Sequence, residues 1–315
     1  MIRRTVIEQS SVLSNKFGKA TPFKHLCIDN FLEAEAAESL LRDFPSFDPE
    51  KAKNEFGETG RKAVRSDLAS ISRFYDTFYE YLTSPGFLNA MSGITGIPDL
   101  LFDRRMYGGG THENLNGQGL HAHVDFNYDE EFGWHRRLNL LIYLNKEWRE
   151  EWGGAIELHS NPRNPDDDSV VAFNPIFNRA VLFETSERSW HGFPHICLPA
   201  DRKHLSRKCI SVYLYTANRP AEEIVPPHGT FYVMDPLPPH IKAGRTLTPE
   251  DISEIKDSLK SRDVWIEYYQ AQELKQNGTI QTLDAALSRN PLLLFASLML
   301  PAPLKQLLKK LLRRK

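Results

Sequence analysis

The sequence predicts an α+β protein with a mainly β core, which we expect to be a jelly roll with N-terminal support helices and a C-terminal helical extension. Apolar residues recur at helical spacing near both ends of the chain. Between these regions lie short apolar runs separated by polar turns, without the alternating helices of a parallel sheet. A two-sheet barrel of this kind has room for a metal site at one end.

Two helices are expected in the N-terminal part. In residues 29–44, Asn30 is the expected N-cap and apolar side chains recur at helical spacing. A second helix is expected over residues 70–83, where large apolar side chains form one stripe. The charged segment 49–66 between them predicts a surface loop.

Strands are expected where short apolar runs follow turn residues. Residues 137–145 form a nearly continuous apolar run, typical of a strand that is covered on both faces. Further strands are expected over residues 153–159, 170–173, 179–184 and 209–216.

The pattern changes again in the C-terminal part. Residues 219–247 are rich in proline and lack periodicity, which predicts a wrapping loop or a linker. We therefore expect one domain over residues 1–220 and a second region, 221–315, with the proline-rich segment and the helical extension. Helices of this extension are expected over residues 249–261, 263–277 and 280–289.

Composition and charge narrow the classes of function. Of the 315 residues, 41% are hydrophobic and 25% charged, and the net charge of -2 argues against a nucleic-acid binder. The three cysteines are far apart and form no CxxC, so neither a disulfide framework nor a zinc knuckle is expected. Because we find no signal peptide and no apolar stretch of about 20 residues, a cytoplasmic location is expected.

The last residues, 303–315, have leucines on one helical face and lysines and arginines on the other. Such a helix can lie on an anionic membrane, which would place the protein peripherally at the inner membrane surface. The alternative is a helix that packs on the preceding helical segment with its polar face in solvent.

Two histidines and one aspartate form a candidate metal site. His123 and Asp125 are separated by one residue, so in a strand both side chains share a face, and His191 follows the strand expected at 179–184. Two imidazoles and one carboxylate can occupy one face of a metal octahedron, which leaves positions for a co-substrate and dioxygen. An isolated HxD is usually a solvated or structural pair, so its context decides.

An arginine at the start of a core strand supplies this context. A buried Arg207 is costly unless it meets a carboxylate, and a dicarboxylate co-substrate that chelates the metal could supply one. Lys208 is a rival for this role. We prefer Arg207 because strand alternation puts it on one face with Ser211 and puts Lys208 on the other.

Together these motifs resemble the catalytic core of the iron(II)/2-oxoglutarate-dependent dioxygenases, in particular the prolyl 4-hydroxylase-like branch. The resemblance covers roughly Tyr107 to Tyr215 and extends to the helix at 29–44. The matching pieces are His123-x-Asp125, Ile142-Tyr143-Leu144-Asn145, Gly153-Gly154-x-Ile156-x-Leu158, Phe183 before His191, and Arg207-x-x-Ile210-Ser211-Val212.

The resemblance implies a double-stranded β-helix (jelly roll) in which His123, Asp125 and His191 hold Fe(II). The implied oxidoreductase uses 2-oxoglutarate and dioxygen to hydroxylate an unactivated C–H bond, with succinate and carbon dioxide as co-products. Ascorbate is a candidate reductant.

The resemblance also implies the contacts of the co-substrate. Arg207 would bind the distal carboxylate of 2-oxoglutarate, and Tyr143 would hydrogen-bond the same group. Tyr107, next to the glycine-rich segment 108–119, is a further candidate contact.

The prime substrate is left open between a protein prolyl (or other) residue and a polar biosynthetic metabolite. Mixed charge after the HxD segment suits a polar substrate, and the glycine-rich loop expected at 108–119 adds to this candidate entrance. The residues concerned are Asn127, Tyr128, Asp129, Arg136 and Arg137.

A further expectation concerns the other histidines. His121 is expected near the metal but not as a ligand, whereas His112, His135, His159, His195 and His204 are expected on the surface or in loops.

Two other classes of function stay open. A metal-dependent cupin-type isomerase or hydrolase would not need Arg207. A non-catalytic jelly-roll binding or sensing module is the third class.

Overall fold

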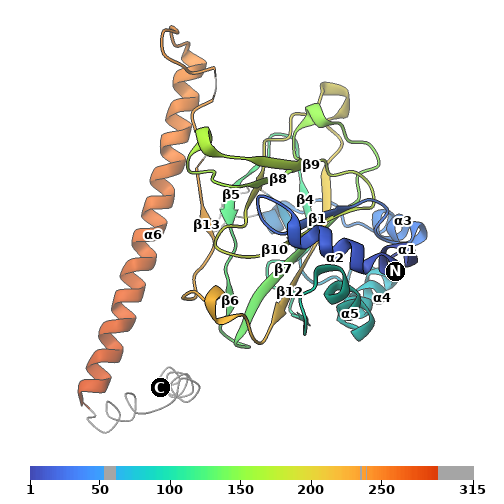
Figure 1. Ribbon diagram of the computed structural model, residues 1–315. Coiled ribbons are helices and arrows are strands. Elements are labelled where there is room, and N and C mark those ends of the chain that lie inside the picture. The colour runs from blue at the N-terminus through green and yellow to red at the C-terminus, as the bar shows by residue number, and fades with distance from the viewer. Residues whose placement is uncertain (53–61, 235, 239, 290–315) are drawn as a thin grey trace. The chain divides into compact units, whose positions relative to one another are not determined.

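The computed structural model describes residues 1–52, 62–234, 236–238 and 240–289 (Figure 1). The chain divides into two compact units, Met1–Pro236 and Leu237–Lys315. The first unit contains both sheets and the N-terminal helices, and the second contains one long helix. The boundary at residue 220 that we expect from the sequence stays a prediction.

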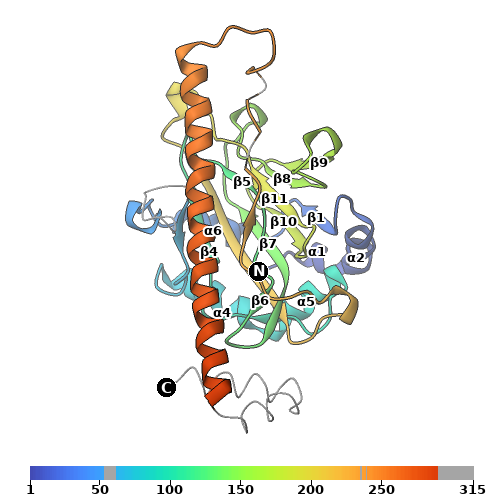
Figure 2. The ribbon, with the colours of Figure 1, turned by 90° about the vertical axis from the view of Figure 1, so that its left-hand side faces the viewer.

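Two antiparallel sheets form the core of the first unit, and the predicted mainly β fold with flanking helices is confirmed (Figures 1 and 2). The larger sheet contains, in spatial order, β1 (His25–Ile28), β10 (Arg179–Glu184), β7 (Trp134–Tyr143), β12 (Arg207–Thr216), β4 (Gly110–Asn114) and β2 (Ala63–Arg65), with β3 (Leu101–Phe102) beside β12 and β6 (Tyr128–Asp129) beside β7. The smaller sheet contains β13 (Phe231–Tyr232), β5 (Leu120–Val124), β11 (Trp190–Phe193), β8 (Ile156–His159) and β9 (Val170–Phe173).

The position of β7 between two apolar clusters explains the continuous apolar run in its sequence. Leu140 and Ile142 belong to the core under the helices, whereas Leu141 and Tyr143 pack in the cluster between the sheets. Both faces are therefore covered, as predicted. The strands predicted at 170–173 and 179–184 have these bounds in the structure, and β12 begins two residues before the predicted 209.

Helices cover the outer face of the larger sheet and share one hydrophobic core with it (Figure 1). They are α1 (Arg4–Glu8), α2 (Ser10–Lys19), α3 (Ala34–Arg42), α4 (Arg73–Thr83) and α5 (Pro85–Thr95). The helix predicted at 70–83 is α4, capped by the Ser72 hydroxyl, which accepts a hydrogen bond from the backbone of Tyr75. The predicted cap at Asn30 is wrong: Asn30 has a φ of 53°, and the helix begins only at Ala34.

Two segments predicted as loops contain strands. Segment 49–66 contains β2, and the glycine-rich segment 108–119 contains β4, in which every residue is buried. Gly110, at a φ of 111°, lies so close to β2 that a Cβ there would overlap the carbonyl oxygen of Arg65. The glycine is therefore required for strand pairing, because only a residue without a side chain permits this approach.

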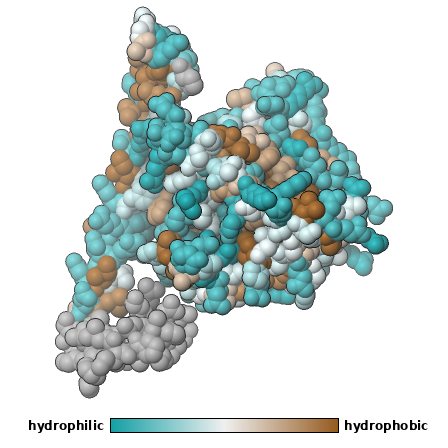
Figure 3. Space-filling view, in the orientation of Figure 1, coloured by the Kyte–Doolittle hydropathy of each residue, from teal (hydrophilic) through white to brown (hydrophobic). Residues whose placement is uncertain are grey.

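Short 3-10 turns and an excursion between His191 and Arg207, largely exposed but anchored by buried side chains, complete the first unit. The face of this unit that Figure 3 shows is mostly hydrophilic with scattered apolar side chains. The turns are η1 (Pro49–Ala52), η2 (Glu150–Trp152), η3 (Pro165–Asp167), η4 (Ala200–Arg202) and η5 (Ala221–Glu223). The excursion between His191 and Arg207 is fixed by Ile196 and Leu198, which are buried in a cluster with two tryptophans.

The second unit contains the continuous helix α6 (Pro249–Arg289), so the prediction of three separate helices is wrong. Gly278 lies inside the helix without breaking it, because an interior glycine costs only about 1 kcal/mol relative to alanine. Within the described residues, no helix combines the length and apolar character that a membrane span needs. The amphipathic stretch 303–315 lies outside the described residues.

Candidate metal centre

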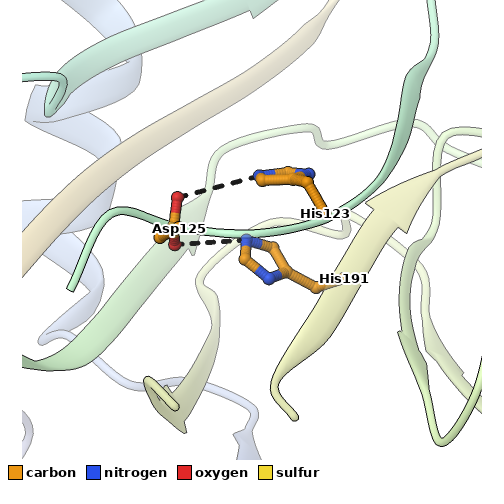
Figure 4. Close-up of side chains that lie close together, drawn as sticks. All are labelled: His123, Asp125 and His191. Carbon is orange, nitrogen blue, oxygen red and sulfur yellow. Dashed lines mark ion pairs between the residues drawn. The ribbon is translucent and has the colours of Figure 1, made fainter. Parts of the chain in front are cut away.

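His123, Asp125 and His191 converge on one point, as Figure 4 shows. His123 in β5 and His191 in β11 are paired directly across the two antiparallel strands, and Asp125 follows the end of β5. Nε2 of His123 lies 3.8 Å from Oδ1 of Asp125, and Nε2 of His191 lies 3.5 Å from Oδ2. One potential ligand atom from each residue lies within 4.8 Å of the others, a separation that one metal ion can bridge.

The two imidazole rings are oriented by their own strands. Nδ1 of His123 lies 2.9 Å from the carbonyl oxygen of His121, and Nδ1 of His191 lies 2.8 Å from that of Ser189. A carbonyl group can only accept, so this network assigns the proton to Nδ1 and the lone pair to Nε2. Both lone pairs are thus on the side of Asp125, which is the tautomer that a metal ligand needs.

Burial keeps both rings neutral. Desolvation and the neighbouring His191 lower the pKa of His123 to about 3, and desolvation also lowers the pKa of His191. Neither imidazole therefore carries a proton on Nε2 at neutral pH, and a metal ion can bind without displacing one.

The Asp125 carboxylate is held from the larger sheet. Its Oδ2 accepts a hydrogen bond of 2.7 Å from Nδ2 of Asn139 and lies 3.0 Å from Nη2 of Arg136. Arg136 donates in turn to Oδ1 of Asn139. Burial alone would raise the pKa of Asp125, but Arg136, the two histidines and Asn139 hold it below its ordinary value. The third candidate ligand is therefore ionised.

A β-bulge in β7 turns Arg136 toward this carboxylate. Leu138 pairs with Leu214 of β12, but Arg136 pairs with the next residue, Tyr215, so Arg137 is an extra residue on β7. Such a bulge re-aims the side chains on one side of it. Without the extra residue, alternation would place Arg137 beside Asp125.

The two adjacent arginines consequently have separate environments. Arg136 lies between two aromatic rings, at 3.6 Å from the centroid of Tyr213 and 4.6 Å from that of Phe126. Arg137 instead donates a 2.7 Å hydrogen bond to Glu184. The sequence predicts Arg136 and Arg137 as residues at the substrate entrance. That interpretation is wrong, because both side chains are buried.

Arg207 lies on the inner face of β12 and is 4% exposed. Nε donates to the carbonyl oxygen of Gly154 at 2.7 Å, and Nη2 donates to the hydroxyl of Tyr143 at 3.0 Å. Nη1 makes no hydrogen bond to any residue that the structure describes. A carboxylate could therefore bind to this arginine without displacing a protein contact.

The neighbouring Lys208 is turned to the opposite side, where Nζ lies 3.0 Å from Oε1 of Glu113. The alternation predicted along this strand is thus confirmed. Because the ammonium group of Lys208 already has an acidic partner outside the barrel, the structure favours Arg207 over Lys208 as the group that faces the interior.

Tyr143 and Tyr107 differ in burial. Tyr143 is fully buried on the inner face of β7, and desolvation raises its pKa, so it remains a phenol that can donate a hydrogen bond. Tyr107 is 64% exposed, and its ring lies edge-on to Phe126 at 5.7 Å between centroids. Its assignment as a co-substrate contact stays a prediction.

The other histidines match the sequence-based expectation only in part. His195 and His204 are exposed, and His159 is paired with Asp168 at 2.7 Å near the end of β8. His112 is wrongly predicted at the surface: it is 6% exposed in β4, and burial lowers its pKa well below 6.5. His135 is half-buried in β7.

Sequence reasoning also misses Tyr232, whose ring stacks on that of His123 with 5.1 Å between centroids and 28° between planes. Tyr232 lies in β13, which pairs with β5. The proline-rich segment 219–247 thus contributes a strand to the barrel. The run Phe231-Tyr232-Val233 is the signal that could have identified it.

Comparisons with known proteins agree with this geometry. Residues 109–215 match the family described as the 2OG-Fe(II) oxygenase superfamily. No curated protein matches the sequence.

Similar solved structures include a prolyl hydroxylase in complex with a hypoxia inducible factor peptide fragment from Trichoplax adhaerens, at 19% identity, 68% coverage of this chain, 93% coverage of that chain and a TM-score of 0.48. A prolyl 4-hydroxylase structure from Phytophthora capsici has 19% identity, with 91% and 87% coverage and a TM-score of 0.44. HygX from Streptomyces hygroscopicus, with nickel and 2-oxoglutarate bound, has 12% identity, with 69% and 87% coverage and a TM-score of 0.41.

The segment that matches the family begins at β4 and ends in β12. It contains His123, Asp125, His191 and Arg207. Residues 109–215, which include all three candidate metal ligands and Arg207, are therefore similar to the 2OG-Fe(II) oxygenase superfamily, the 2-oxoglutarate-dependent oxygenases.

Proposed function

We propose that the protein is an Fe(II)- and 2-oxoglutarate-dependent dioxygenase of the prolyl 4-hydroxylase-like branch, which hydroxylates an unactivated C–H bond. The observation that carries this proposal is the convergence of three ligands in metal-binding protonation states. The Nε2 lone pairs of His123 and His191 and the ionised carboxylate of Asp125 all lie within 4.8 Å of one another.

The residues of the chain have distinct parts in this reaction. Bound iron supplies the oxidising chemistry together with 2-oxoglutarate and dioxygen. His123, Asp125 and His191 would hold the metal, and Arg136 with Asn139 would keep the carboxylate ionised and oriented. Arg207 and the phenol of Tyr143, which are already hydrogen-bonded to each other, would bind the distal carboxylate of 2-oxoglutarate.

The substrate is either a protein prolyl (or other) residue or a polar metabolite. Two of the entrance candidates have structural partners in the first unit. The Asn127 side chain hydrogen-bonds the backbone of Pro226 and His228, and Asp129 is paired with Arg105. A substrate that binds to Asn127 or Asp129 would therefore have to compete with these contacts.

A turnover assay tests the proposal. The purified protein is supplied with Fe(II), 2-oxoglutarate and dioxygen, with or without ascorbate, and succinate is measured. Slow succinate formation without prime substrate is expected, and ascorbate should prolong it. Peptides and metabolites are then screened for a mass gain of one oxygen atom.

The outcomes separate the classes of function. Metal binding without consumption of 2-oxoglutarate would point to a cupin-type isomerase or hydrolase. Failure to bind a divalent metal at all would point to a non-catalytic binding or sensing module. Either result would refute the dioxygenase assignment.

A further inference from the structure

Lys62, a half-buried residue immediately before β2, is aligned with the proposed co-substrate site. Ala63 of β2 pairs with Glu113 of β4, and Asn114 of β4 pairs with Arg207 of β12. Continuing the β2 register by one residue places Lys62 opposite Asn114. Residues in register across neighbouring strands share a face of the sheet, so Lys62 lies on the inner face with Arg207.

The charge of Lys62 acts on several groups in the interior. After desolvation, Lys62 is among the causes that lower the pKa of His112, and it opposes the rise that burial gives to the pKa of Cys209. Cys209 packs in the cluster between the two sheets, so the ammonium group is near that space. Lys62 makes no hydrogen bond or ion pair with the residues that the structure describes.

The strand that carries Lys62 is firmly attached to β4. The close approach at Gly110 fixes the position of Arg65, and the hydroxyl of Ser66 donates a 3.0 Å hydrogen bond to the carbonyl oxygen of Gly109. The position of Lys62 therefore follows from backbone pairing.

The charges around the site are unbalanced. Three cations, Arg136, Arg207 and Lys62, act on the buried His112, and the candidate metal centre contains one carboxylate, Asp125. Arg136 pairs with Asp125, and Arg207 is assigned to the co-substrate in the proposed function. A divalent metal and a dianionic co-substrate cancel each other, so the charges of Arg207 and Lys62 both remain when the two are bound. Arg207 is in contact with the co-substrate in the proposed function, which leaves Lys62, among the described residues, as the cation for a further anion.

We propose that Lys62 binds an anionic oxygen group of the prime substrate, a carboxylate or a phosphate, and so selects an anionic substrate for this site. The inference rests on the proposed dioxygenase function and deepens it by naming the class of substrate. An ammonium group on a flexible stem is suited to either anion, because it acts as a point charge with three donors.

A matched pair of small probes tests the inference before the substrate is known. The full chain is loaded with Mn(II) and saturated with 2-oxoglutarate, and the ¹⁹F relaxation of trifluoroacetate is compared with that of neutral trifluoroacetamide. Trifluoroacetate should bind the wild-type site about tenfold more tightly, as a hydrogen bond to a charged group predicts. Lys62→Gln should remove this difference, and Lys62→Arg should retain most of it.

The control is Lys146→Gln, which removes an exposed lysine that is paired with Glu38 at 2.7 Å, and it should behave as the wild type. Equal binding of the two probes to the wild type would overturn the inference, and so would an anion preference that persists in Lys62→Gln. If Lys62→Gln raises the requirement for 2-oxoglutarate as much as Arg207→Ala does, Lys62 is a co-substrate anchor instead. Failure of Mn(II) to bind would overturn the proposed function as well, and electron paramagnetic resonance of Mn(II) identifies that case separately.

Discussion

The two sheets of the barrel contribute to the metal centre in different ways. The smaller sheet supplies His123 and His191, and each ring is oriented by a carbonyl group two residues earlier in the chain. The larger sheet supplies the charges: Arg136 holds Asp125, and Arg207 faces the interior beside Tyr143. Ligand orientation is therefore a local property of two strands, whereas the electrostatics depend on contacts between the sheets.

Removal of a ligand from the smaller sheet should have the largest effect. His123→Ala should lower 2-oxoglutarate-dependent succinate formation by more than about 100-fold, because even partners outside the ligand set change metal sites by 10–100-fold. His121→Ala alters the same face of β5 but should leave metal binding in place. Retained succinate formation in His123→Ala would show that the triad is not the metal site.

Removal of a charge from the larger sheet should affect the co-substrate instead of the metal. Arg207→Ala should raise the 2-oxoglutarate concentration for half-maximal turnover by roughly 100-fold, as loss of one partner of a buried charged pair predicts. Metal affinity should change far less, because Arg207 contacts none of the three ligands. Lys208→Ala is the matched control, and a larger effect there would assign the anchor to Lys208.

Loss of the contact between Arg136 and Asp125, which joins the two sheets, should have an intermediate effect on metal affinity. Arg136→Met leaves Asp125 without its cationic partner and should weaken Fe(II) or Mn(II) binding by about 10-fold or more, measured by titration. Arg137→Met removes the adjacent arginine, which is paired with Glu184, and should reduce the free energy of unfolding without this change in affinity. Equal metal affinities in the two variants would contradict the division of roles that the bulge creates.

The smallest expected effect is a pH dependence of stability that comes from His112 on the larger sheet. Its pKa is lowered by burial, so between that value and 6.5 the unfolded chain binds more protons than the folded one. Stability is thus retained above pH 6.5 and falls as the pH decreases below it. In metal-free protein, His112→Gln should flatten the slope of the unfolding free energy by up to about 1.4 kcal/mol per pH unit, measured by denaturant unfolding.

An exposed histidine provides the comparison for this last experiment. His204→Gln is the matched control, because His204 is exposed and its substitution removes no buried group. A slope in His112→Gln as steep as that of the wild type would assign the acid sensitivity to other groups.

Local patterns bring the three candidate ligands together, because His123 and Asp125 are one residue apart and His191 pairs with His123. They also predict β9 and β10, whose apolar runs end at turn residues. They fail for β2, β4 and β13, since these strands are short, and β4 contains mostly polar residues. Simple alternation along β7 also places Arg136 on the wrong face. The bulge that turns it inward is visible only in the pairing with β12 and not in the sequence of β7 alone.

The extra residue Arg137 reverses the side-chain alternation of β7. On one side of it, odd-numbered side chains face the interior, and on the other side even-numbered ones do. Deletion of Arg137 would join Arg136 directly to Leu138 and leave it opposite Tyr215, so Arg136 would stay beside Asp125, whereas the pairs of Arg137 with Glu184 and Glu223 would be lost. One residue can therefore be removed at the bulge without changing the face on which Arg136 lies.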